Sequence, residues 1–128
     1  KPGVSWLDMH DLSYRVLCTE FLKLGLLRGE LEELMDANLG SVFMPHGLGH
    51  LLGLDTHDVG GYGEGLPPRD SRPGYSSLRT ARNLEAGMVI TVEPGVYFID
   101  YLLDQALGDP DKSKFLVPEA LEEYRGFG

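Results

Sequence analysis

The sequence is poor in cysteine, in positive charge and in long apolar runs, and each shortage excludes a class of protein. Cys18 is the single cysteine among 128 residues, so no internal disulfide can form and a reducing cytosol is expected. Asp and Glu number 20 against 11 Lys and Arg, a formal charge of -9, which argues against nucleic acid or an anionic membrane as the main partner. No apolar run approaches the roughly 20 residues that cross a bilayer. We expect a soluble chain of one domain at most.

Both ends of the sequence favour a piece of a longer polypeptide. The chain opens on Lys1-Pro2-Gly3, which is turn chemistry without an initiator methionine. It closes on Gly126-Phe127-Gly128, directly after a helical pattern, and such glycines usually lead into a further element. We therefore expect sequence to precede Lys1 and to follow Gly128.

Helical patterns are expected near both ends of the chain. Ser5 is a candidate N-cap, with Asp8 three residues later, for a helix that ends at Gly25. Its predicted apolar face comprises Trp6, Met9, Leu12, Val16, Phe21 and Leu24, whereas His10 is expected on the solvated face. Further helices are expected over 30–38 and over 118–124, the latter with Pro118 in its first turn, and 100–107 is expected to form a short helix or a turn.

Four short apolar runs predict β-strands. Residues 88–92 give the strongest signal, since the run is rich in β-branched side chains, and 96–99 is expected to return as a second strand. Residues 42–44 and 51–54 predict buried strands on either side of a glycine-rich segment. Helices followed by strands with interspersed helices indicate an α+β or α/β fold.

Three of the four histidines, His46, His50 and His57, lie within twelve residues. Imidazole titrates near neutral pH and binds borderline metals, so the cluster predicts a metal and proton-transfer site; buried histidines beside a bend are the alternative. Pro45 and the neighbouring glycines make a helix costly here. Gly47 and Gly49 would let the backbone approach a ligand closely, or would simply serve a tight turn.

Two further segments carry candidate functional groups. Glu93 follows the strand predicted over 88–92, and a carboxylate at such a position needs a partner, which a metal would provide. Arg79 and Arg82 suit bidentate binding of a small acidic substrate, with a surface salt bridge as the alternative. The long loop over 59–74 is either functional or a surface excursion.

Four segments together resemble a known family: Pro45-His46-Gly47-Leu48-Gly49-His50, His57-Asp58-Val59-Gly60-Gly61-Tyr62, Leu78-Arg79-Thr80-Ala81-Arg82 and Thr91-Val92-Glu93-Pro94-Gly95. The chain resembles the prolidases, the Xaa-Pro dipeptidases of peptidase family M24, over essentially all 128 residues. The first and last segments are shared widely in that superfamily, which includes methionine aminopeptidase and aminopeptidase P. The other two are more particular to prolidase.

The resemblance implies a partial pita-bread fold of class α+β, a curved, mostly antiparallel sheet backed by helices. It implies two divalent ions, usually manganese with zinc possible, and a small dipeptide substrate that ends in proline or hydroxyproline. By motif match His50 and Glu93 are metal ligands, and Glu93 also accepts a proton from the attacking water. His46 and His57 match catalytic positions, and His57 and Arg79 match substrate-binding positions. Family members are usually cytosolic homodimers.

The chain departs from the family pattern in its ligand set. The family's two aspartate ligands precede the match to Lys1 and its last glutamate follows the match to Gly128; Asp8 and Asp11 align elsewhere and do not replace them. Residues 1–128 are thus expected to be an incomplete catalytic domain that binds metal weakly and is inactive alone. Two alternatives remain: an aminopeptidase P type of enzyme, for which the Arg79 region discriminates, and a non-catalytic truncated isoform.

Overall fold

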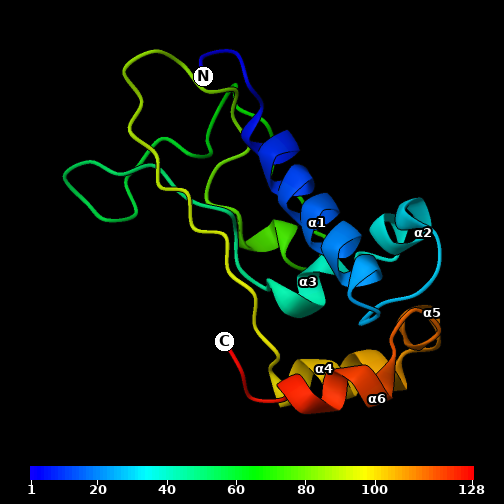
Figure 1. Cartoon of the computed structure of the whole chain (residues 1–128). Helices are drawn as coiled ribbons and strands as arrows, with labels where there is room; N and C mark the ends of the chain where they lie inside the picture. The colour runs from blue at the N-terminus through cyan, green and yellow to red at the C-terminus, as the bar shows by residue number, and fades with distance from the viewer. The chain divides into compact units, whose positions relative to one another are not determined.

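The computed structural model describes residues 1–128 and is built mainly from helices and extended coil. The α-helices are α1 (Trp6–Lys23), α2 (Leu31–Asp36), α3 (Gly40–Phe43), α4 (Asp100–Gly108), α5 (Pro110–Ser113) and α6 (Pro118–Leu121). Two 3-10 turns, η1 (Tyr75–Ser77) and η2 (Glu122–Tyr124), complete the regular structure. Between α3 and α4 the chain runs as coil that only η1 interrupts (Figure 1). None of the helices combines the length and the apolar character that a membrane crossing requires.

The chain divides into two compact units. The first comprises Lys1–Ser13 and Pro45–Pro94, and the second comprises Tyr14–Met44 and Gly95–Gly128. Because the boundary falls within α1, this helix contributes its N-terminal part to the first unit and its remainder to the second.

The predicted bounds of the long helices are confirmed, and their causes are visible. The Ser5 hydroxyl accepts a hydrogen bond from the Asp8 amide at 3.2 Å, which caps α1 as expected. Gly25 adopts φ +73°, a conformation that ends helices and favours glycine. Pro118 begins α6, which continues into η2. The short helix α5 was not predicted; its cap is Asp109, whose carboxylate accepts from the Asp111 amide.

The predicted apolar face of α1 is wrong in part. Leu12, Val16 and Leu24 are exposed, by 48%, 54% and 67%. The buried stripe of the helix instead follows a spacing of three and four residues through Trp6, His10, Tyr14, Leu17, Cys18 and Phe21. His10 therefore lies inside the protein, where the sequence analysis expected a solvated face.

In the first unit two extended segments pair in antiparallel register. Leu51 and Ile90 form a bridge, and hydrogen bonds join the Leu52 amide to the Val89 carbonyl at 3.0 Å and the Thr91 amide to the His50 carbonyl at 2.9 Å. The pairing does not extend into a ladder, so the strands predicted over 51–54 and 88–92 are reduced to a single bridge. Nor are they fully buried, because Leu54 and Val89 are exposed. A strand needs partners on its edges, and residues 96–99 form no bridge either.

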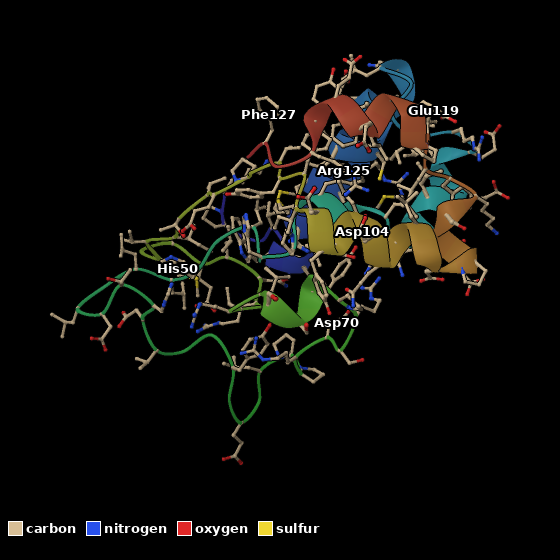
Figure 2. All side chains as sticks on the ribbon, turned by 90° about the horizontal axis from the view of Figure 1, so that it is seen from below. His50, Asp70, Asp104, Glu119, Arg125 and Phe127 are labelled. Carbon is tan, nitrogen blue, oxygen red and sulfur yellow. The ribbon has the colours of Figure 1, made fainter.

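The second unit packs its helices around an aromatic cluster. The rings of Phe21 and Phe43 meet edge to face at 4.8 Å, and Phe98 lies 5.7 Å from both. Arg125 joins α4 to the C-terminal turn, since it pairs with Asp104 at 2.8 Å and with Asp100 and Glu122 (Figure 2). These carboxylates are exposed, so each pair adds little stability.

The strand predicted over 42–44 is wrong, because these residues belong to α3 and its C-cap. Asn38 adopts φ 56° and its carbonyl accepts hydrogen bonds from both the amide and the hydroxyl of Ser41, which starts a helical turn. The apolar side chains are buried as expected, and a short apolar run does not by itself distinguish a strand from a helical turn.

Tyr14 anchors the end of this turn. Its ring fills the space where a Cβ on Gly40 would lie, and its hydroxyl donates a hydrogen bond of 2.9 Å to the Met44 carbonyl. We expect Tyr14→Phe to lower the free energy of unfolding by about 1–2 kcal/mol, because a buried carbonyl loses a donor while the packing is retained. Urea denaturation followed by circular dichroism measures this difference. A variant as stable as the wild type would show that the hydrogen bond contributes nothing.

Candidate metal and substrate site

The antiparallel register brings His50 and Glu93 together. It places His50 opposite Thr91 and Leu48 opposite Glu93, with hydrogen bonds from the Glu93 amide to the Leu48 carbonyl at 2.6 Å and from the His50 amide to the Thr91 hydroxyl at 2.9 Å. Side chains two residues apart on one strand point to the same face, so Glu93 becomes the diagonal neighbour of His50. The His50 Nε2 atom and the Glu93 Oε1 atom lie 2.9 Å apart.

The two facing atoms suit a shared cation. His50 Nδ1 lies 2.9 Å from the Leu51 carbonyl oxygen, which can only accept, so Nδ1 donates its proton there. In the neutral ring, Nε2 then presents a lone pair to the Glu93 carboxylate, another acceptor. Such an arrangement is unfavourable unless a proton or a metal ion lies between the acceptors, and a backbone carbonyl on the far ring nitrogen is the usual support of a metal-binding histidine. The donor set therefore fits a divalent metal.

His57 and Arg79 lie beside this pair. The His57 ring meets the His50 ring edge to face with centroids 4.4 Å apart. Desolvation, and after it the positive charge of nearby Arg79, lowers the pKa of His57. The side chains of His57, Arg79 and Glu93 are all exposed, whereas His50 is buried.

His46 lies on the same segment. Its Nδ1 atom is 2.8 Å from the Gly47 carbonyl oxygen. A hydrogen bond from Thr91, and then the charges of His50 and His46, hold the pKa of Glu93 below its ordinary value. The structure thus gathers the predicted residues His46, His50, His57, Arg79 and Glu93 into one region of the first unit. It brings no group of three or more His, Cys, Asp or Glu side chains together as a complete metal site.

Arg82, the second arginine considered, has a structural role. It donates a hydrogen bond of 3.0 Å to the Gly60 carbonyl and pairs with Glu85 at 2.7 Å. Of the two roles considered for Arg79 and Arg82, Arg82 therefore has the second, a surface salt bridge.

The glycines of the histidine segment are required by close backbone packing. A Cβ on Gly49 would lie 2.0 Å from the Thr91 carbonyl oxygen, and a Cβ on Gly47 would lie 2.8 Å from the Leu78 Cα atom. The close approach expected for these residues is thus made to neighbouring segments of the same chain. Gly49 lets the segment of His50 lie against the segment of Glu93.

His10 is the functional neighbour that the sequence analysis missed. Its ring is fully buried, its Nδ1 atom accepts a hydrogen bond of 3.2 Å from the Leu48 amide, and it meets the Tyr75 ring edge to face at 4.7 Å. One turn earlier on α1, the Trp6 indole donates to the Gly49 carbonyl at 3.3 Å. The two side chains together hold the backbone between His46 and His50. Trp6 and His10 are four residues apart, which places them on one face of a helix, and this spacing could have indicated that His10 is buried with Trp6.

Comparison with known proteins gives concordant results. The model of metallopeptidase family M24 matches residues 1–116. The chain is 58% identical to human Xaa-Pro dipeptidase and 59% identical to the rat protein, over all 128 residues in each case. It is 41% identical to a probable Xaa-Pro aminopeptidase of Verticillium alfalfae. The chain spans about a quarter of the length of these curated relatives, 26% to 27%.

Solved structures give the same result. Escherichia coli aminopeptidase P with the inhibitor Pro-Leu superimposes on the whole chain with a TM-score of 0.66 and 38% identity, over 22% of that protein. The zinc-substituted form of the same enzyme, in complex with product, gives a TM-score of 0.65 at 39% identity, again over 22% of its chain.

Stability should depend on pH through His10. Burial lowers the pKa of His10 from 6.5 to about 4, while Asp11 and Asp70 oppose the shift and His46 and Arg72 favour it. Below pH 6.5 His10 becomes protonated in the unfolded chain but stays neutral in the folded chain. The contribution of the neutral His10 to the free energy of unfolding is therefore fully present above pH 6.5 and is lost as the pH falls toward 4. We expect a loss of about 2 kcal/mol between pH 7 and pH 5 from this group.

The His10→Asn variant isolates this contribution, because the amide keeps an acceptor for Leu48 and does not titrate. Urea unfolding of both proteins at pH 7 and pH 5 should show a smaller pH dependence in the variant. Equal pH dependence in the two proteins would contradict the burial of a neutral His10, as would an NMR titration midpoint near 6.5.

Gly49→Ala tests the backbone packing at the site. We expect a loss of about 1–3 kcal/mol or more in the free energy of unfolding, because the new methyl group collides with a backbone carbonyl that cannot move alone. Gly108→Ala is the matched control, since that position at the end of α4 has open space and an ordinary φ. Chemical denaturation should place the control within about 0.5 kcal/mol of the wild type. Equal effects of the two substitutions would contradict the packing argument.

Proposed function

The chain belongs to metallopeptidase family M24, and from this membership and the geometry of the site we propose that it forms part of a dinuclear-metal dipeptidase that hydrolyses Xaa-Pro and Xaa-hydroxyproline dipeptides. The observation that carries the proposal is the contact of 2.9 Å between His50 Nε2 and Glu93 Oε1, two atoms that a metal ion would join when the imidazole is neutral, as a proton does when it is charged. The high identity to human Xaa-Pro dipeptidase supports this substrate class.

Each residue of the site has a proposed role. His50 and Glu93 would hold a divalent metal ion, in our view manganese with zinc as the other candidate, which would supply Lewis acidity and lower the pKa of a water. Glu93 accepts the proton of the attacking water, and its lowered pKa means that the carboxylate is ionised at neutral pH. His46 and His57 contact the developing oxyanion, and the proton that Glu93 takes from the water returns through an imidazole to the proline nitrogen.

Arg79 is proposed to bind the free carboxylate of the dipeptide. Its side chain is exposed, and its charge acts on His57, which we place against the substrate. Bidentate pairing of a guanidinium with a terminal carboxylate would restrict the enzyme to short peptides. The alternative is an aminopeptidase P activity, favoured by the structural likeness to the Escherichia coli enzyme, which would leave the far end of the substrate open.

We further propose that residues 1–128 are an incomplete catalytic domain. Two donors alone hold a metal weakly, and Val89, Val92 and Val96 are exposed along the extended segments. Strands of a longer polypeptide, completing a curved, mostly antiparallel sheet, would cover these side chains. A non-catalytic isoform remains the alternative for the short chain. The complete protein is proposed to be a cytosolic homodimer, as the resemblance to prolidases implies.

The test is manganese-dependent hydrolysis of Gly-Pro by this chain and by a longer polypeptide that extends beyond both of its ends. We expect activity only in the longer protein, and Glu93→Gln in that protein should reduce kcat by at least about 100-fold, since the variant loses a ligand and a proton acceptor. Failure of both proteins to cleave Gly-Pro would refute the substrate assignment. Turnover by the short chain would refute the incomplete site.

A further inference from the structure

We infer that Tyr62 and Arg69 are positioning residues for Arg79 and thereby set the preference for substrates with a free terminal carboxylate. The inference rests on the proposed function, in which Arg79 binds that carboxylate. Neither Tyr62 nor Arg69 needs to touch the substrate, because both act on the backbone that carries Arg79.

Two side chains of the long loop converge on one oxygen atom. The Tyr62 hydroxyl donates a hydrogen bond of 3.0 Å to the Leu78 carbonyl, and Arg69 Nη1 donates to the same carbonyl oxygen. Arg69 Nη1 also donates to the Ser76 carbonyl at 2.9 Å. A carbonyl oxygen has two lone pairs, so both acceptor sites of the Leu78 oxygen are used by these two donors.

The two donors also hold each other in place. The Arg69 guanidinium lies over the Tyr62 ring, 4.2 Å from its centroid, which is a cation–π contact. Stacking fixes the plane of the guanidinium and therefore the direction of its N–H groups. The pair works as one unit, built from residues seven positions apart in a loop that has no regular structure before η1.

The anchored oxygen belongs to the peptide group that enters Arg79. Because a peptide group is planar, fixing the Leu78 carbonyl also fixes the Arg79 nitrogen and the direction in which its Cα departs. On the other side of Arg79, Gly61 packs so closely that a Cβ there would lie 2.0 Å from the Arg79 carbonyl oxygen. Leu78 and Thr80 are buried to 0% and 1% exposure. The backbone is thus fixed on both sides of an exposed arginine side chain.

A fixed backbone matters for Arg79 because a guanidinium recognises a carboxylate through two parallel hydrogen bonds in one plane. An arginine on a mobile loop would lose orientational freedom on binding, and part of the binding free energy would be spent in ordering it. Preorganisation should therefore show in the KM of substrates that present the carboxylate. It should not show for substrates that lack it.

The experiment uses the longer, active protein and compares Gly-Pro with Gly-Pro-amide, which lacks the carboxylate. We expect Tyr62→Phe to raise the KM for Gly-Pro about 5- to 10-fold, the effect of losing one hydrogen bond, with kcat within about two-fold. Arg69→Gln should raise this KM at least as much, because it loses the hydrogen bonds to the Leu78 and Ser76 carbonyls and the contact with the Tyr62 ring. The KM for Gly-Pro-amide should stay unchanged. Tyr62→Phe is the decisive variant, because it keeps the ring under Arg69 and removes only the hydroxyl.

Two further variants separate the possible outcomes. Arg79→Ala should abolish the discrimination between the two substrates; if it does not, the proposed role of Arg79 fails. Arg72→Gln is the matched control, since Arg72 stacks on Tyr75 at 3.7 Å and pairs with Asp70 in the same loop and does not bind the Leu78 carbonyl. If Arg79→Ala removes discrimination while Tyr62→Phe and Arg69→Gln behave like Arg72→Gln, this inference is wrong and the proposed function stands. An equal loss on both substrates would also overturn it.

Discussion

The candidate site depends on the antiparallel register between residues 48–52 and 89–93. One hydrogen bond of 2.6 Å, from the Glu93 amide to the Leu48 carbonyl, marks its end. A shift of the register by one residue would turn Glu93 to the opposite face and remove it from His50. Thr91 reinforces the register from the side chain, because its hydroxyl accepts a hydrogen bond from the His50 amide and donates one of 3.3 Å to the His50 carbonyl. Gly49 makes the close approach possible.

Two sets of side-chain hydrogen bonds hold the backbone of the candidate site within the first unit. Helix α1 holds the His46–His50 backbone through buried Trp6 and His10, and the loop over 59–74 holds the backbone at Arg79 through Tyr62 and Arg69. The side chains proposed to bind metal and substrate are mostly exposed, while the groups that orient their backbones are buried or stacked. This division preorganises the site, because the backbones that carry the exposed side chains are fixed before a substrate binds.

Local signals predicted the helices and selected His50 and Glu93 as candidate site residues. Ser5, Gly25 and Pro118 act within a turn of their own position, so their consequences for helix ends can be found in the sequence. His50 and Glu93 were found by their motifs, and the structure then brought them into contact. The strand predictions were wrong because a strand forms only when a neighbouring strand pairs with it. Residues 88–92 have side chains that favour a strand, but within this chain they pair with one segment through a single bridge. The position of His10 was predicted wrongly because histidine is usually counted as a polar surface residue. Its burial as a neutral ring depends on a hydrogen bond from Leu48, thirty-eight residues away, which the local sequence does not reveal.

The hydrogen bond between Leu48 and His10 also affects the motions of the segment from His46 to His50. The Leu48 amide donates its hydrogen bond to the fully buried ring of His10, although the segment around Leu48 has no regular secondary structure. Ordinary loops open by local fluctuation and exchange their amide hydrogens quickly. Release of Leu48 would remove a hydrogen-bond donor from the buried His10 ring, which costs free energy unless the packing of α1 opens as well. We therefore expect the Leu48 amide to exchange more slowly than the amides of an ordinary loop, although the backbone around it is coil.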